Sequence, residues 1–270
     1  MSFEVKKISA DGTKFAYMKF GSGKTPLVII PGLSLQSVIP AAEAIEKHYQ
    51  VLTEEFCVYL FDSPVAPGEG YNIDRYAADI YAAIKKLGLE SICLFGVSQG
   101  GMVAQTVTVS HPELVAGLAL GSTACRMDPD RHEAVDTWTA LARQGKCEEL
   151  YLAFGERVYP PETFESFKQA FSQAAKTVTE ADLKRFVILG NGSAGFDVSD
   201  KLSRIGCPVL VIGDTDDRVL GAEASYEIKE KIKDARLYMY EGYGHAAYDT
   251  APDYAERLYS FFKSINNTVR

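Results

Sequence analysis

The sequence predicts an α/β fold, in which a mainly parallel central sheet is flanked by helices. Three observations lead to this prediction. Short, continuously apolar runs alternate with stretches of helical periodicity, which is typical of strands covered on both faces. A serine between two glycines follows one of these runs, in GVSQG at 96–100. A long helical segment, 125–196, interrupts the alternation before the late strands.

The first expected strand is 14–21, KFAYMKFG, whose alternating apolar and polar residues and terminal Gly-Ser-Gly turn indicate a half-buried edge strand. Continuous apolar runs then predict strands that are buried on both faces. These runs are PLVIIPG (26–32), FCVYLFDSP (56–64), SICLFG (91–96), LVAGLALGS (114–122) and PVLVIGD (208–214).

The helices of the sheet domain are predicted by apolar spacing. Residues 73–88, IDRYAADIYAAIKKLG, place Ala77, Ile80, Ile84 and Leu87 at helical spacing and end at a glycine. The last helix places Tyr254, Leu258, Phe261, Phe262 and Ile265 on one face. Residues 102–110, MVAQTVTVS, are rich in β-branched residues that favour a strand. We nevertheless expect a buried helix there, because the glycine-flanked serine before it requires one.

Residues 125–196 contain no convincing buried strand but several helical stretches, at 129–145, 146–159, 161–176 and 179–192. Thr179 and Asp182 resemble a capping box at the start of the last stretch. We therefore predict a core formed by 1–124 and 197–270, with 125–196 as a helical lid over a pocket. The alternative is that the segment only adds packing at one edge of the domain.

Composition limits the function classes. The formal net charge is −8 and no block of basic residues occurs, which argues against nucleic acid and anionic membranes as partners. Five cysteines lie singly, and no apolar leader or membrane-spanning run is present. Metal-ligand spacing is absent as well. These features predict a cytoplasmic enzyme without metal, nucleic-acid partner or membrane insertion, and they leave the oligomeric state open.

Ser98 lies in the pattern G-x-S-x-G, which is typical of a sharp turn from strand to helix that presents a nucleophile. Side chains at Gly96 or Gly100 would collide with the neighbouring helix or strand. A serine hydroxyl needs a histidine as base and a carboxylate to orient that histidine. His245 is the best candidate base, because it lies in a glycine-flanked loop after a strand-like run and before the last helix.

The other histidines are less suitable. His48 lies in a polar stretch, His111 precedes a proline at a helix end, and His132 lies among charged residues of the 125–196 segment. For the carboxylate, the strand at 208–214 opens into Asp214, Asp216 and Asp217. Acidic residues at strand ends are often turn formers, so we expect at least two of these three to act only in that way.

With the serine, the acidic loop and the histidine in this order, the sequence resembles the α/β-hydrolase superfamily over almost its whole length. The resemblance implies Asp216 as the acid, with Asp217 as the second choice, and an oxyanion hole formed by the backbone N–H groups of Leu33 and Gln99. The superfamily usually has His-Gly-x where this chain has PGL at 31–33. It also implies that no cofactor is needed.

The resemblance implies hydrolysis of a small, apolar carboxylic ester, or a related lactone or thioester, through an acyl-enzyme on Ser98. Alternatives are carbon–carbon bond hydrolysis, perhydrolase chemistry, or a receptor-like binding protein with a silent triad. Serine at position 98 excludes the dehalogenase and epoxide-hydrolase members, which use aspartate. The lid is expected to line the substrate pocket with Trp138, Phe154, Tyr159, Phe164 and Phe167.

Overall fold

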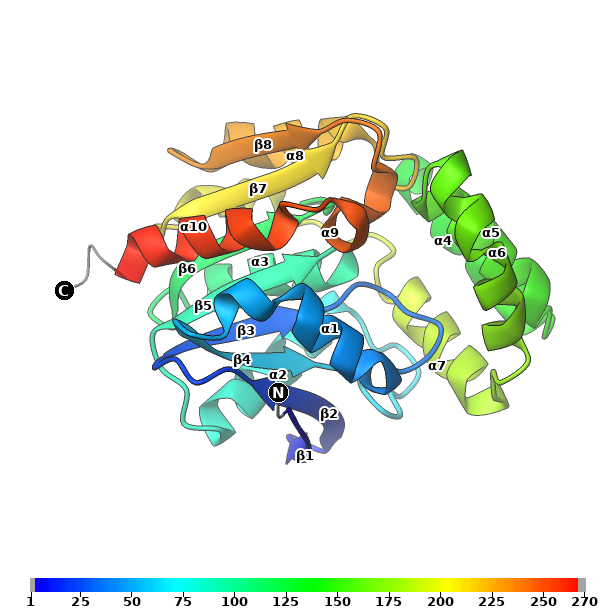
Figure 1. The fold of residues 1–270 in the computed structure, drawn as a ribbon, viewed down its shortest axis with the longest axis horizontal. Coiled ribbons are helices and arrows are strands. Elements are labelled where there is room, and N and C mark those ends of the chain that lie inside the picture. Colours follow the sequence, from blue (N-terminus) through cyan, green and yellow to red (C-terminus); the bar gives the residue numbers. More distant parts are fainter. Residues whose placement is uncertain (1–2, 267–270) are drawn as a thin grey trace.

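The computed structural model describes residues 3–266 and contains a twisted sheet of eight strands with helices on both faces (Figure 1). The strand order is β1-β2-β4-β3-β5-β6-β7-β8. Strand β2 runs antiparallel to both of its neighbours, β1 and β4, and all other neighbouring strands pair in parallel. This arrangement confirms the predicted fold class. The strands are β1 (Glu4–Ala10), β2 (Thr13–Phe20), β3 (Thr25–Ile30), β4 (Phe56–Phe61), β5 (Ile92–Val97), β6 (Val115–Gly121), β7 (Val209–Asp214) and β8 (Arg236–Tyr240).

The prediction of an edge strand at 14–21 was wrong. This strand, β2, pairs on one side with β4 and on the other with β1, so β1 is the edge. The sequence of β1, EVKKISA, is charged and mostly exposed. It therefore lacks the apolar pattern by which the other strands were recognised, although charged residues are common on edge strands.

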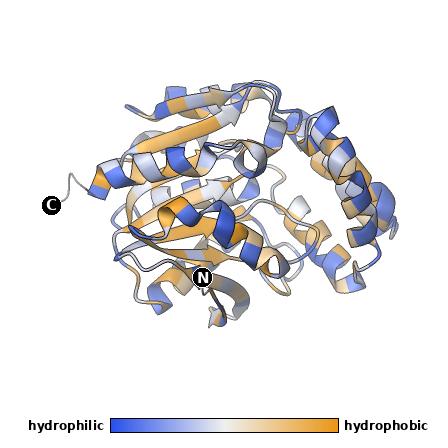
Figure 2. Ribbon diagram, in the orientation of Figure 1, coloured by the Kyte–Doolittle hydropathy of each residue, from blue (hydrophilic) through white to orange (hydrophobic). Residues whose placement is uncertain are grey.

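Alternate residues of the central strands enter two separate cores, one on each face of the sheet. In β3, Val28 and Ile30 belong to the first core, whereas Leu27 and Ile29 belong to the second. Figure 2 shows these strands as hydrophobic ribbons between helices with mixed faces. The first core is covered by α2 (Ile73–Lys86), α3 (Gln99–Ser110) and α8 (Ala222–Lys231), and the second by α1 (Ala42–His48) and α10 (Tyr254–Asn266).

The MVAQTVTVS stretch forms most of α3, as expected from its position after the serine turn. Almost every residue of this helix is buried. The hydroxyls of Thr106 and Thr108 donate hydrogen bonds to the carbonyls of Met102 and Ala104, four residues earlier. Because the threonines satisfy their polar groups within the helix, tertiary burial overrides their strand propensity.

Residues 125–196 contain four helices, α4 (Pro129–Arg143), α5 (Cys147–Val158), α6 (Pro161–Ala175) and α7 (Glu180–Asn191). They lie to one side of the sheet, beyond the carboxyl ends of its parallel strands (Figure 1). The two ends of the segment meet at an antiparallel bridge between Arg126 and Asp197. Thr179 and Asp182 form the capping box predicted at the start of α7.

Short helices complete the described chain: α9 (Ala247–Thr250) and the 3-10 turns η1 (Ile39–Ala41), η2 (Gln50–Leu52), η3 (Ser199–Arg204) and η4 (Gly244–Ala246). Within residues 3–266, no helix combines the length and the apolar character that a membrane span requires.

Candidate active site

Ser98 lies at the turn between β5 and α3, with φ 51° and ψ −121°. This region of backbone space is strained for a residue with a side chain. A Cβ atom on Gly96 would lie 2.7 Å from the Cβ atom of Ala104, and one on Gly100 would overlap the carbonyl oxygens of Ile30 and Pro31. The two glycines therefore allow the close packing that keeps the serine in its strained position.

His245 links the serine to an acidic side chain. Its Nε2 lies 3.0 Å from Ser98 Oγ, and its Nδ1 lies 2.9 Å from Asp217 Oδ2. The histidine comes from η4, after β8, and the aspartate from the loop after β7. The side chains of His245 and Asp217 are 4% and 5% exposed, so this pair is almost fully shielded from water. The geometry allows Ser98 to donate to Nε2 while the Nδ1–H group donates to the carboxylate.

The structure corrects the choice of acid from Asp216 to Asp217. The Asp216 carboxylate is directed away from the histidine and accepts a hydrogen bond from the Gly242 N–H at 2.8 Å. Asp214 accepts from the N–H groups of Asp216 and Tyr243. Two of the three aspartates thus act as turn formers, as expected. In the superfamily the acid commonly stands three residues after the glycine that ends the strand, which pointed to Asp216 when Gly213 was taken as that glycine. In the structure β7 continues through Asp214.

Several groups hold Asp217 in its ionised form. Burial alone would raise its pKa, but the positive charge that His245 can carry and the hydrogen bond from its ring oppose this effect. The N–H groups of Val219 and Leu220 also donate to Oδ1, at 2.8 and 3.0 Å. The net result is that the pKa of Asp217 lies below its ordinary value.

Two backbone N–H groups next to Ser98 are available to a ligand. Gln99 is the first residue of α3, so its N–H has no partner within the helix. Leu33 follows β3 and faces the same cavity as Ser98. Within residues 3–266, neither N–H group donates a hydrogen bond to the protein. They are suited to hold a developing negative charge on oxygen.

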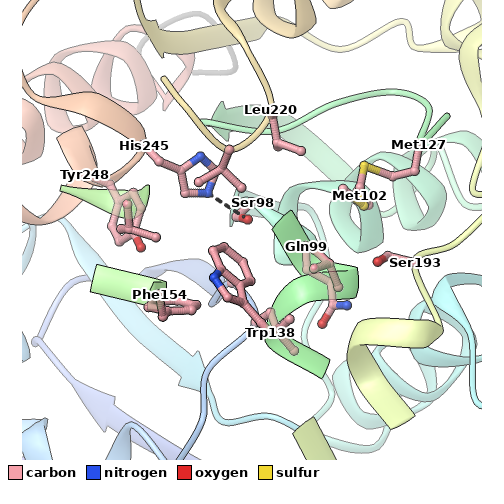
Figure 3. Close-up of a pocket in the computed structure, with 15 residues that line it drawn as sticks. Ser98, Gln99, Met102, Met127, Trp138, Phe154, Ser193, Leu220, His245 and Tyr248 are labelled. Carbon is pink, nitrogen blue, oxygen red and sulfur yellow. Dashed lines mark hydrogen bonds between the residues drawn. The ribbon is translucent and has the colours of Figure 1, made fainter. Parts of the chain in front are cut away.

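A small cavity of about 30 Å³ lies above Ser98, between the ends of the strands and the helices of 125–196 (Figure 3). Trp138 and Phe154, two of the five predicted lining residues, border it, and their rings are 4.6 Å apart. The other lining side chains are mostly apolar. The full lining consists of Gly32, Leu33, Ser98, Gln99, Met102, Met127, Val135, Trp138, Phe154, Val158, Ser193, Val219, Leu220, His245 and Tyr248.

The prediction that Tyr159, Phe164 and Phe167 line the pocket was wrong. Tyr159 packs its ring against Phe167 and donates its hydroxyl proton to Asp249. Phe164 stacks on Phe171. These rings instead fill the contact between α5 and α6. Their sequence spacing shows that they share a helix face but not which neighbour that face meets.

Sequence reasoning missed most of the apolar lining and one polar residue, Ser193. Met102 follows Ser98, and Tyr248 follows His245, by about one helical turn. This proximity was the only sequence signal for either lining residue. Ser193 lies in a short turn after α7, in a glycine-rich stretch that predicts only a loop. Among the described residues, no cluster of three histidine, cysteine or acidic side chains is suited to a metal ion.

The comparison with known families agrees with this geometry. Residues 27–257 match the model of the alpha/beta hydrolase family. The chain belongs to this family. Its membership makes it a hydrolase. It also confirms the resemblance that was inferred from the G-x-S-x-G turn, the acidic loop and the histidine.

Individual alpha/beta hydrolases similar to this chain differ in their substrates. The "Putative carbamate hydrolase RutD" of Agrobacterium fabrum is 24% identical over 85% of this chain and 89% of its own length. The 2-hydroxy-6-oxo-6-(2'-aminophenyl)hexa-2,4-dienoic acid hydrolase of Metapseudomonas resinovorans is 24% identical over 97% and 92%. The solved enol-lactonase of Burkholderia xenovorans has the same fold, with a TM-score of 0.83, 19% identity, and coverage of 96% and 100%.

Proposed function

We propose that this alpha/beta hydrolase is a serine hydrolase that cleaves a small carboxylic ester, or a related lactone or thioester, through an acyl-enzyme on Ser98. The observation that carries the proposal is the continuous hydrogen-bonded path from Ser98 Oγ through His245 to Asp217. A serine becomes a nucleophile only when a base removes its proton, and this path supplies the base and its orienting carboxylate.

The reaction proceeds in two halves. Ser98 Oγ attacks the carbonyl carbon while His245 Nε2 accepts the serine proton, and the carbonyl oxygen becomes an oxyanion held by the N–H groups of Leu33 and Gln99. The oxyanion then re-forms the carbonyl, and the leaving oxygen or sulfur takes the proton from Nε2. Water repeats the sequence on the acyl-enzyme, releasing the acid and restoring the Ser98 hydroxyl. Asp217 stabilises the imidazolium in both halves.

We propose that residues 125–196 act as the lid of this site. Their ends pair at the base of the segment, and α4 and α5 place Trp138, Phe154 and Val158 over Ser98. The Gln99 side-chain amide donates to the Leu189 carbonyl at 2.7 Å, so α7 is tied to the nucleophile turn. A cavity of about 30 Å³ holds only a few water molecules. Because the lining is mostly apolar, a small acyl group with a mainly apolar chain fits this space best, and larger substrates require the lid to move.

Two further properties belong to the proposal. All five cysteines are unpaired, which supports the reducing environment of the cytoplasm. The negative net charge supports a small-molecule substrate rather than a nucleic acid.

The test is hydrolysis of ethyl, phenyl and thioethyl esters of short acids by the wild type, Ser98→Ala and Ser122→Ala. Ser122 is a matched control because it also follows a strand, has a positive φ of 42°, is buried, and lies outside the cavity. We expect kcat/KM to fall by at least about 10⁴-fold for Ser98→Ala. Ser122→Ala should retain activity within a few-fold.

Equal activity of wild type and Ser98→Ala on every ester would contradict the acyl-enzyme. Ligand binding by a wild type that hydrolyses none of the esters would favour the receptor-like alternative. If a vinylogous 1,5-diketone is cleaved faster than all esters, the enzyme is a carbon–carbon bond hydrolase. In that case the ester substrate is wrong, but the role of Ser98 is retained.

A further inference from the structure

A second buried histidine lies on the lid side of the site, behind the cavity wall. His132, in the first turn of α4, is 5% exposed, and its Nδ1 lies 3.0 Å from Asp136 Oδ1. Its Nε2 lies 3.2 Å from both Ser193 Oγ and the Gly190 carbonyl oxygen. In the sequence this histidine lies among charged residues, but the structure buries it between α4 and the end of α7. The mechanism on Ser98 makes no use of it.

The hydrogen bonds leave Ser193 with a free acceptor position. Its hydroxyl proton is directed to the Gly190 carbonyl oxygen, 2.7 Å away. The direction of the contact between His132 Nε2 and Ser193 Oγ depends on which ring nitrogen of His132 carries the proton. A hydroxyl has one donor and two acceptor positions. The contacts with Gly190 and His132 use at most one acceptor position, so at least one lone pair of Ser193 remains.

Ser193 also stands out chemically within the cavity. Among the polar side chains in the lining, Ser98 and His245 belong to the nucleophilic path, and the amide of Gln99 donates to Leu189. The Tyr248 hydroxyl lies on the His245 side of Ser98, so Ser193 is the hydroxyl on the other side (Figure 3). Ser193 is 2% exposed and borders the cavity from the lid. A buried hydroxyl with an unused lone pair at the cavity wall can accept a hydrogen bond from a ligand.

The position of Ser193 indicates which part of a substrate it would meet. Figure 3 shows Ser193 on the same side of Ser98 as Met102 and Met127, whereas Tyr248 lies on the opposite side, beside His245. His245 must protonate the leaving group, so the leaving group lies on its side. The acyl chain then extends toward the methionines and Ser193.

We infer that Ser193, positioned by His132, recognises a hydroxyl group on the acyl part of the substrate, so that the enzyme prefers esters of hydroxy acids over esters of plain alkanoic acids. This inference rests on the proposed function for its acyl direction. The substrate hydroxyl donates to the free lone pair of Ser193, and the methylenes between the two ends contact Met102 and Met127. His132 is a positioning residue, because it holds Ser193 and does not itself border the cavity.

The experiment compares matched ethyl esters in which a terminal methyl is replaced by a hydroxyl, from propanoate to hexanoate, with the free acids followed by pH-stat. For at least one chain length, wild type should have about tenfold higher kcat/KM for the hydroxylated ester. Ser193→Ala should abolish this ratio. Ser166→Ala, which removes an exposed lid hydroxyl that also donates to a carbonyl three residues earlier, should preserve it.

His132→Gln separates positioning from simple stability. If His132 has only a structural role, His132→Gln lowers kcat/KM equally for the hydroxylated and the plain ester. If His132 positions Ser193, the variant lowers the ratio of the two kcat/KM values by several-fold. The inference is overturned if Ser193→Ala leaves the ratio of kcat/KM for the hydroxylated over the plain ester unchanged. It is also overturned if this ratio is one or less in the wild type at every chain length. In both cases, activity on the plain esters leaves the proposed function intact.

Direct binding provides a test that requires neither turnover nor folding of the Ser193 variant. The free acids of each pair are titrated calorimetrically into Ser98→Ala. Tighter binding of the hydroxy acid supports the inference even if no ester is cleaved, in which case only the proposed function fails. Equal or weaker binding of the hydroxy acid at every chain length overturns it.

Discussion

Replacing Asp217 by asparagine tests the assignment of the acid, because Asp216→Asn is a nearly isosteric control one residue away. Asp217 Oδ2 lies 2.9 Å from His245 Nδ1 in a site where both side chains are at most 5% exposed. An asparagine can present its amide N–H₂ to Nδ1, which then accepts instead of donating. Nε2 would carry the proton and could no longer accept one from Ser98.

The expected loss follows from this tautomer change. The equivalent exchange in serine hydrolases lowers kcat by about 10⁴-fold, or about 5.5 kcal/mol in the activation barrier. Asp216 is exposed and accepts hydrogen bonds from the Gly242 N–H at 2.8 Å and the Thr215 hydroxyl at 3.4 Å, both of which an asparagine oxygen can keep. Asp216→Asn should therefore change kcat by less than about threefold.

The assay is steady-state hydrolysis of a chromogenic short-chain ester, with circular dichroism and thermal unfolding to show that both variants are folded. A loss of 10⁴-fold in Asp216→Asn with near-normal activity in Asp217→Asn would refute the assignment. Similar small losses in both variants would show that the carboxylate is not needed to orient His245.

Three further results are expected. Gly100→Ala should lower the free energy of unfolding by about 1–3 kcal/mol in urea titrations, because the added Cβ overlaps backbone oxygens. Gly68→Ala, whose Cβ meets no atom within 4 Å, should leave the free energy of unfolding nearly unchanged. Equal losses in the two variants would contradict the packing argument. Since the folded pKa of Asp217 lies below its unfolded value of about 3.9, its ionised form stabilises the protein above about pH 4, and this contribution is lost as pH falls through the folded pKa. The difference in unfolding free energy between wild type and Asp217→Asn should therefore shrink on acidification, and a difference that grows would reverse the sign of the shift. Trp138→Ala should raise the ratio of kcat/KM for octanoate over butyrate esters about tenfold, while Phe167→Ala, outside the cavity, should leave it unchanged.

The parts of this protein that local patterns determine were predictable from the sequence. Continuous apolar runs identified β3 to β7, and the glycine-flanked serine identified the turn into α3 even though the helix residues favour a strand. The capping residues Thr179 and Asp182 identified the start of α7. In each case the signal lies within a few residues of the feature that it predicts.

The errors arose where the outcome depends on tertiary geometry. Asp216 and Asp217 are adjacent, and only the shape of the turn after β7 decides which carboxylate faces His245. The aromatic residues of α5 and α6 show helical spacing, but whether they face the cavity depends on how the two helices pack. The burial of His132 and its contact with Ser193 join residues about 60 positions apart, and no local pattern reports such a contact.

The central claim is that Ser98 is an activated nucleophile, and the most direct test is intact mass after brief incubation with a fluorophosphonate probe. We predict a single adduct on the wild type that maps to Ser98, is absent from Ser98→Ala, and remains on Ser122→Ala. A small phosphonofluoridate is used in parallel so that the small cavity does not exclude the probe. No adduct from either probe on folded wild type, or an adduct that persists in Ser98→Ala, would contradict the account.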